Sequence, residues 1–274
     1  DLHSFPTRRS SDLIICKEVV KMLQKKALFL VTAESEIHPL VSFAKVFKQK
    51  YNVDVDVIYI KDILKYEVFP VSIEGMGLNI GANYAFKEYR ELEEKTVKKL
   101  KDKITSDISK FYSKDGETAE IVLEELKKYD LLVLVKNEKV TPVLKEILRS
   151  IFKPLIILPN IEDFRLDNLM LLDDGAYNAN KTLFTFFHMF GEQKIDVLRV
   201  NVEEEDENSL AERFGDNYNL IHKKGDTFKT IMNEAQNYDL VLMGDLRYTV
   251  MVERITGKLG VRILENLQKP IFIV

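Results

Sequence analysis

The sequence predicts an α/β protein built from two similar domains, each with a parallel sheet between layers of helices. Short apolar runs alternate along the chain with segments in which apolar residues recur at helical spacing. Such alternation indicates parallel strands joined by right-handed crossover helices. One helix and strand unit also occurs twice, which indicates a duplicated domain.

The repeated unit is a helix that leads into a buried strand. It occupies residues 116–134 and again residues 225–243, and in both copies thirteen positions lead from the opening glycine to a Tyr-Asp pair. Apolar residues at i, i+3, i+4 and i+7 place one apolar stripe on each helix, and the continuous apolar run that follows is typical of a strand covered on both faces. A further helix and a strand that opens with Lys-Pro follow each copy. The two halves are therefore predicted to be homologous.

The first domain begins with two strands around a helix. The predicted elements are a strand at 27–31, a helix at 37–47, a strand at 53–60, a connecting segment at 61–84, a charged helix at 85–103, a strand at 108–112, and then the repeated helix, strand, helix and strand as far as Pro159. The connecting segment contains Gly75-Met76-Gly77. A phosphate-binding glycine loop directly follows a strand and opens a helix. This segment does not, so we interpret it as a connection or a lid.

The second domain repeats this order. We predict a strand at 169–172, a helix at 178–190, strands at 195–200 and 219–222, and the second copy of the repeated unit. An acidic run at 203–207 follows the second strand. Calcium loops space their carboxylates between backbone ligands, which this run does not. We interpret it as a solvated loop rather than a metal site.

The chain divides into four parts: a leader at 1–21, a first domain at 22–159, a linker at 160–167 and a second domain at 168–274. Residues 1–13 read like a translated sequencing adapter, and the codons before Met22 can encode a ribosome-binding site. We therefore expect the natural chain to start at Met22 and exclude the leader from the fold. The alternative is a genuine amphipathic N-terminal helix that carries Ile14, Ile15, Val19 and Val20.

Composition excludes several classes of function. The balance of 40 basic and 44 acidic residues gives a net charge of −4 and a pI near 5.8, which argues against nucleic-acid binding. No apolar segment approaches the length of a membrane span. The single cysteine, Cys16, lies in the leader, so disulfides and thiol catalysis are not expected. We expect a cytoplasmic protein.

No catalytic or metal-binding set stands out. His38, His188 and His222 show no metal-ligand spacing, and no local motif assembles a Ser-His-Asp or Cys-His set. His188 lies among phenylalanines on a predicted helix, which is typical of a packing residue. We expect no catalytic residues, no protein-held metal and no enzymatic activity.

The order of elements, the duplication and a C-terminal motif resemble the universal stress protein family in its tandem form. Its members have doubly wound five-stranded parallel sheets, and many bind ATP through Gly, two residues, Gly, nine residues, and then Gly-Ser or Gly-Thr. Here Gly244 matches the first glycine and Gly257 the third, in the required frame. Arg247 replaces the second glycine, and Lys258 replaces the hydroxyl residue.

The resemblance also implies further nucleotide contacts. Asp174 and Gly175 stand where the family has its Asp-Gly-Ser turn, at the position that typically contacts the adenosine part. Val200, Met243 and Leu259 complete the implied site. Asp173 and Asp174 are adjacent at a strand end, so we expect them to point to opposite sides.

The altered motif supports two interpretations. In the first, Arg247 and Lys258 add cations that favour a triphosphate, and the protein is a regulator that senses ATP, or another adenine nucleotide, with Mg²⁺. In the second, the motif is a relic, because a side chain at the second glycine hinders close approach of a ligand, and both domains form a nucleotide-free module for an unidentified protein partner.

The first domain has lost the loop. Only six positions lead from Val135 to Thr141, the counterpart of Gly257. Thr141-Pro142 is typical of a helix N-cap and first helical residue. We predict that the first domain binds no nucleotide and pairs with the second as an intramolecular pseudo-dimer, with further homo-oligomerisation left open.

Overall fold

The computed structural model describes residues 24–62, 79–137, 140–202, 209–244 and 259–274. The predicted leader, the Gly75-Met76-Gly77 sequence and the acidic run at 203–207 lie outside these residues, and so do Arg247, Gly257 and Lys258. Within the described ranges, no helix is both long enough and apolar enough to cross a membrane.

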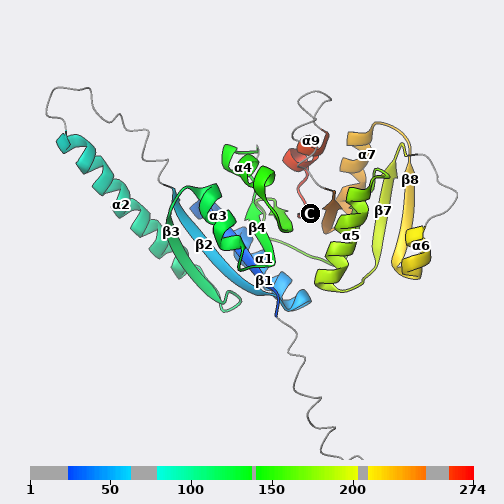
Figure 1. Cartoon of the computed structure of the whole chain (residues 1–274), viewed down its shortest axis with the longest axis horizontal. Coiled ribbons are helices and arrows are strands. Elements are labelled where there is room, and N and C mark those ends of the chain that lie inside the picture. Colours follow the sequence, from blue (N-terminus) through cyan, green and yellow to red (C-terminus); the bar gives the residue numbers. More distant parts are fainter. Residues whose placement is uncertain (1–23, 63–78, 138–139, 203–208, 245–258) are drawn as a thin grey trace, which may run out of the picture.

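The first half contains five strands and four α-helices in its described residues (Figure 1). In chain order these are β1 (Lys26–Val31), the short 3-10 helix η3 (Glu34–Glu36), α1 (Ile37–Tyr51), β2 (Asp54–Asp62), α2 (Asn79–Asp102), β3 (Lys110–Gly116), α3 (Thr118–Leu126), β4 (Leu131–Val135), α4 (Pro142–Ser150) and β5 (Leu155–Leu158).

Several boundaries in this half differ from the prediction, among them those of α1, which ends at Tyr51 rather than at residue 47, and those of α2 and β3. Helix α2 begins at Asn79 rather than at residue 85, and β3 runs from Lys110 to Gly116 rather than over 108–112. The register explains the difference at β3, because β2 continues to Asp62 and pairs there with Gly116. Strand β3 lies at the edge of the sheet. An edge strand is half exposed, so the polar sequence of β3 gave no apolar signal.

The second half follows the predicted order closely. Its elements are β6 (Leu169–Leu172), α5 (Tyr177–Phe190), β7 (Ile195–Val200), α6 (Ser209–Phe214), η5 (Gly215–Asn217), β8 (Tyr218–Lys223), α7 (Thr227–Glu234), η6 (Ala235–Asn237), β9 (Leu240–Met243), α9 (Leu259–Asn266) and β10 (Ile271–Ile273). Strands β6 and β7 have the predicted bounds, whereas the short helix α6 was not predicted.

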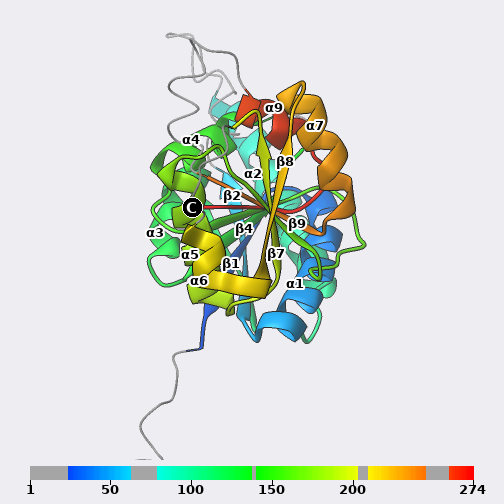
Figure 2. The same ribbon diagram turned by 90° about the vertical axis from the view of Figure 1, so that its right-hand side faces the viewer.

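The ten strands form one sheet in the order β3-β2-β1-β4-β5-β10-β9-β6-β7-β8. All pairs within each half are parallel, as predicted. The halves join where β5 and β10 pair in antiparallel orientation, with Ile156 opposite Phe272. In Figure 2 the strands fan out with the usual twist, and helices cover both sides of the fan.

Each face of the sheet carries one core that extends through both halves. Helices α1, α2, α5 and α6 pack on one face, and α3, α4, α7 and α9 pack on the other. Aromatic side chains connect the halves on the first face. Phe190 lies 5.4 Å from Phe47 and 4.6 Å from Tyr51, between ring centroids. The two halves therefore share a sheet and a core, which fits the predicted pseudo-dimer.

Candidate functional site

Four of the predicted site residues, Asp174, Gly175, Met243 and Gly244, lie at the carboxyl ends of β6 and β9. These strands pair in parallel, with Leu171 opposite Leu242, so residues 173–175 and 243–244 follow neighbouring strand ends. The chain enters α5 on one face after β6, and α9, the helix after β9, lies on the other face. Strand order reverses at this point, and open α/β sheets bind ligands at such switch points.

A tight turn presents Asp174 at the end of β6. Gly175 adopts a φ of +81°, a conformation that glycine takes without strain. Its N–H donates to Asp173 Oδ1 at 2.9 Å, and the Ala176 N–H donates to Asp174 Oδ1 at 3.0 Å. Asp173 is 7% exposed whereas Asp174 is exposed. This difference in exposure agrees with the prediction that the two carboxylates point to opposite sides.

A buried ion pair with the neighbouring strand β7 stabilises this turn. Arg199, on the neighbouring strand β7, donates through Nε to Asp173 Oδ2 at 2.8 Å. Both side chains are at most 10% exposed. Sequence reasoning missed Arg199, although an arginine in the otherwise apolar second part of β7 was a signal for a buried charge partner.

Gly244 lies against the start of α5. A Cβ on Gly244 would be 3.0 Å from Asn178 Cβ and 3.3 Å from the Asn178 carbonyl carbon. Only a glycine fits this contact without a shift. Gly244, the first glycine of the motif, is therefore needed for packing against α5 in addition to any contact with a ligand. The buried Thr182 hydroxyl contacts the preceding residue, because its oxygen lies 3.2 Å from Met243 O as well as 2.9 Å from Asn178 O, and its single proton is shared between these two acceptors.

The remaining predicted residues divide into two groups. Val200 ends β7, is half-buried and pairs with Lys223, and Leu259 begins α9 and is also half-buried. Arg247, Gly257 and Lys258 lie outside the described residues. The structure thus brings Asp174, Gly175, Met243 and Gly244 to adjacent strand ends.

The equivalent position of the first half holds a cavity of about 160 Å³ at the ends of β1, β2 and β4. Its buried polar lining residues are Glu36, Asp62, Thr118 and Lys136. The Glu36 carboxylate accepts the Thr32 and Ala33 N–H groups at 2.6 and 3.2 Å. Thr118 donates to Asp62 Oδ2 at 2.8 Å. Among these buried residues two carboxylates outnumber the single ammonium of Lys136, so the lining disfavours a phosphate.

The start of α4 also agrees with the predicted loss of the loop. Thr141 is the N-cap, its hydroxyl accepts the Leu144 N–H at 3.2 Å, and Pro142 occupies the first turn. Helix α4 therefore begins with a side-chain N-cap, as the Thr141-Pro142 sequence predicted.

Lys136, at the exit of β4, is a buried cation that sequence reasoning missed. It is 5% exposed, and its Nζ donates to Leu264 O and, at 3.0 Å, to Glu265 O at the end of α9. Burial lowers the pKa of Lys136 to about 8, against an opposing effect of the Glu265 charge. The only hint in the sequence was a lysine that directly follows a fully apolar strand.

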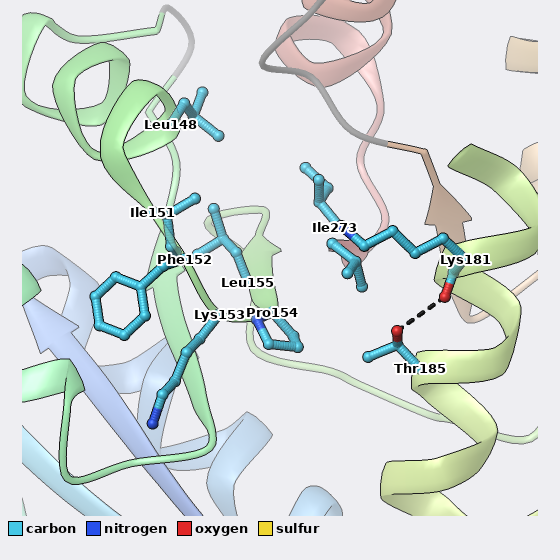
Figure 3. A pocket seen from close by; sticks show the side chains of 10 residues that line it. Leu148, Ile151, Phe152, Lys153, Pro154, Leu155, Lys181, Thr185 and Ile273 are labelled. Atoms are coloured by element: carbon cyan, nitrogen blue, oxygen red, sulfur yellow. Dashed lines mark hydrogen bonds between the residues drawn. The ribbon is translucent and has the colours of Figure 1, made fainter. Parts of the chain in front are cut away.

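A second hollow, of about 140 Å³, lies between the end of α4 and α5 (Figure 3). Leu148 and Ile151 face Lys181 and Thr185 across it, whereas the ring of Phe152 points away. The Thr185 hydroxyl donates to its own helix at Lys181 O, 2.8 Å away. Among the residues that the structure describes, no group of three or more His, Cys, Asp or Glu side chains could hold a metal ion.

No family model and no curated protein sequence matches the chain. Its structure matches that of a universal stress protein from Archaeoglobus fulgidus with a TM-score of 0.60 and 13% identity, over 92% of this chain and 98% of that chain. The chain has the universal stress protein fold. Because this match extends over both halves, the prediction of a tandem universal stress protein fold is confirmed.

Two further structures are similar. A functionally unknown protein from Pseudomonas aeruginosa matches with a TM-score of 0.52 and 10% identity over 92% of both chains. A universal stress protein in complex with cAMP matches 50% of this chain and 98% of that chain, with a TM-score of 0.32 and 11% identity.

Proposed function

We propose that the second half of this universal stress protein-like chain binds an adenine nucleotide, with ATP as the first candidate, and that binding regulates conformation or assembly rather than a chemical reaction. The observation that carries the proposal is the position of the Asp174 turn and Gly244 at adjacent strand ends of the switch point. The spacing from Gly244 to Gly257 keeps the frame of the nucleotide motif.

The adenosine part would lie against the turn at the end of β6. Asp174 is exposed, and one of its oxygens accepts the Ala176 N–H. A carboxylate has further lone pairs, which can accept hydrogen bonds from ribose hydroxyls or the adenine amino group. Val200 and Met243 end the strands on either side of β6 and would supply apolar contacts.

The phosphates would lie toward the start of α9. The first N–H groups of a helix have no intrahelical acceptor and carry a partial positive charge, so they favour an anion. Leu259 begins α9, and Lys258 precedes it in the sequence. Lys258 and Arg247 would add charge-assisted hydrogen bonds in place of the motif's usual backbone contacts. Mg²⁺ would enter with the nucleotide, held largely by phosphate oxygens and water.

The first half would bind no nucleotide. Support comes from the two buried carboxylates of its cavity, Glu36 and Asp62, and from the N-cap at Thr141 where a phosphate loop would stand. One nucleotide per chain is therefore expected.

Calorimetric titration of ATP with Mg²⁺ tests the proposal. We expect one site with a Kd in the micromolar range, about −8 kcal/mol. Asp174→Ala should weaken binding at least about tenfold, the factor that corresponds to one charge-assisted hydrogen bond. Asp216→Ala is the matched control, because Asp216 is also exposed but precedes β8, at the opposite ends of the strands.

Absence of binding would favour the alternative function. If millimolar ATP gives no heat and leaves the melting temperature unchanged, the motif is a relic and the protein is a nucleotide-free interaction module. The next experiments would then be capture of protein partners and measurement of the oligomeric state.

A further inference from the structure

The end of α9 is held by a residue of the other half. Lys136 follows β4 in the first half, and α9 follows β9 in the second. The Lys136 ammonium crosses the boundary between the halves and donates to Leu264 O and Glu265 O. A weaker contact lies beside it, since the Val140 N–H donates to Glu265 Oε1 at 3.4 Å.

This contact supplies donors to two of the carbonyls at the end of the helix. The last four carbonyls of an α-helix have no intrahelical donor. In α9, Ile263 O accepts the Leu267 N–H at 2.8 Å, and the next two carbonyls accept the Lys136 ammonium. A cation at the negative end of a helix is favourable, and more so when it is buried. Lys136 is only 5% exposed, so water cannot easily replace it.

The opposite end of the same helix is where we propose that the phosphates bind. Helix α9 has eight residues and spans about 12 Å at 1.5 Å per residue. Its buried residues Ile263 and Leu264 pack in the core of that face. Because both ends belong to one short helix, we expect a contact at its last turn to influence the position of its first turn.

We infer that Lys136 is a positioning residue for the nucleotide site: acting from the first half through α9, it sets where the phosphate end of the second-half site lies. The inference rests on the proposed nucleotide binding. It assigns a specific role to the first half, because Lys136 follows β4 of that half and contacts a helix of the second half.

Three variants test the inference. Lys136→Met keeps most of the side-chain length but removes the donors, and Lys136→Arg keeps a cation with donors. Lys153→Met is the matched control. Lys153 also donates to main-chain carbonyls, those of Tyr129 and Lys127, but both belong to its own half. ATP affinity is measured by calorimetry, and amide hydrogen exchange is measured across residues 259–267.

We expect Lys136→Met to weaken ATP binding about tenfold, within the usual range of coupling between sites, and to increase amide exchange in α9. Lys136→Arg should restore both properties substantially, and Lys153→Met should change neither. Rescue by arginine separates positioning through this contact from a general loss of packing.

Different results overturn different claims. Equal ATP affinity of Lys136→Met and the unmodified protein overturns the inference and leaves the proposed function intact. No ATP binding by the unmodified protein overturns the proposed function, and with it the role of Lys136 in binding. In either case, unchanged amide exchange in α9 of Lys136→Met would show that the contact does not hold the helix.

Discussion

The buried pair of Asp173 and Arg199 offers the sharpest test of how the candidate site is supported. Arg199 Nε lies 2.8 Å from Asp173 Oδ2, and the two side chains are 10% and 5% exposed. Asp173 Oδ1 meanwhile accepts the Gly175 N–H. Arg199→Met keeps apolar contacts along the side chain but leaves the Asp173 carboxylate buried without this cation. Breaking a buried pair in this way costs about 3–5 kcal/mol of unfolding free energy.

Urea unfolding followed by circular dichroism measures this loss. Arg149→Met is the matched control, because Arg149 forms an exposed pair with Glu146 at 3.8 Å, with side chains 57% and 51% exposed. An exposed pair contributes about 0–1 kcal/mol, so the control should unfold almost like the unmodified protein. A loss below about 1 kcal/mol for Arg199→Met, equal to the control, would refute the claim that a buried charge supports the Asp174 turn.

Three further results are expected. Gly244→Ala should lower the unfolding free energy by about 1–3 kcal/mol, since the new Cβ would lie 3.0 Å from Asn178 Cβ; an unchanged urea midpoint contradicts this. Thr141→Ala should lower it by about 1 kcal/mol through loss of the bond from the Leu144 N–H, with no effect on ATP affinity. The pKa of Lys136 is lowered to about 8, so between pH 8 and 10 the folded state binds fewer protons than the unfolded state. The stability of the unmodified protein relative to Lys136→Met should therefore rise over that range, and a flat or falling difference contradicts the assignment.

The sequence predicted the strands that are covered on both faces. Strands β6 and β7 have the predicted bounds, because a continuous apolar run between helices is a strong local signal. It predicted β3 poorly, since an edge strand such as Lys110–Gly116 needs few apolar residues. Pairing of β5 with β10 depends on contacts between residues more than a hundred positions apart, which local periodicity does not contain.

The sequence indicated those residues of the candidate site that the main-chain conformation requires. Gly175 and Gly244 are required by a positive φ and by a close helix contact, and such constraints leave a glycine in the sequence. Arg199 and Lys136 were missed because their partners lie on other elements. Their burial follows from the order of the strands and from the meeting of the two halves, so a single lysine or arginine at a strand end gives no specific signal.

The duplicated fold uses its equivalent strand ends for different tasks. After β9, the chain continues from Gly244 into the long segment that keeps the frame of a nucleotide loop. After β4, the equivalent segment is seven residues shorter, and six positions lead from Val135 to the N-cap at Thr141. The short connection leaves the lysine buried at the boundary between the halves, where its cation meets the carbonyl end of α9. We infer that loss of the loop in one half and support of the helix in the other are linked, because Lys136 belongs to the short segment that stands in place of the loop. If a glycine-rich loop is restored between Val135 and Thr141, the change should therefore also affect α9 and the nucleotide site of the second half. We expect it to increase amide exchange in α9 and to weaken nucleotide binding in the second half, and a variant that gains a second ATP site with the first unchanged would contradict this link.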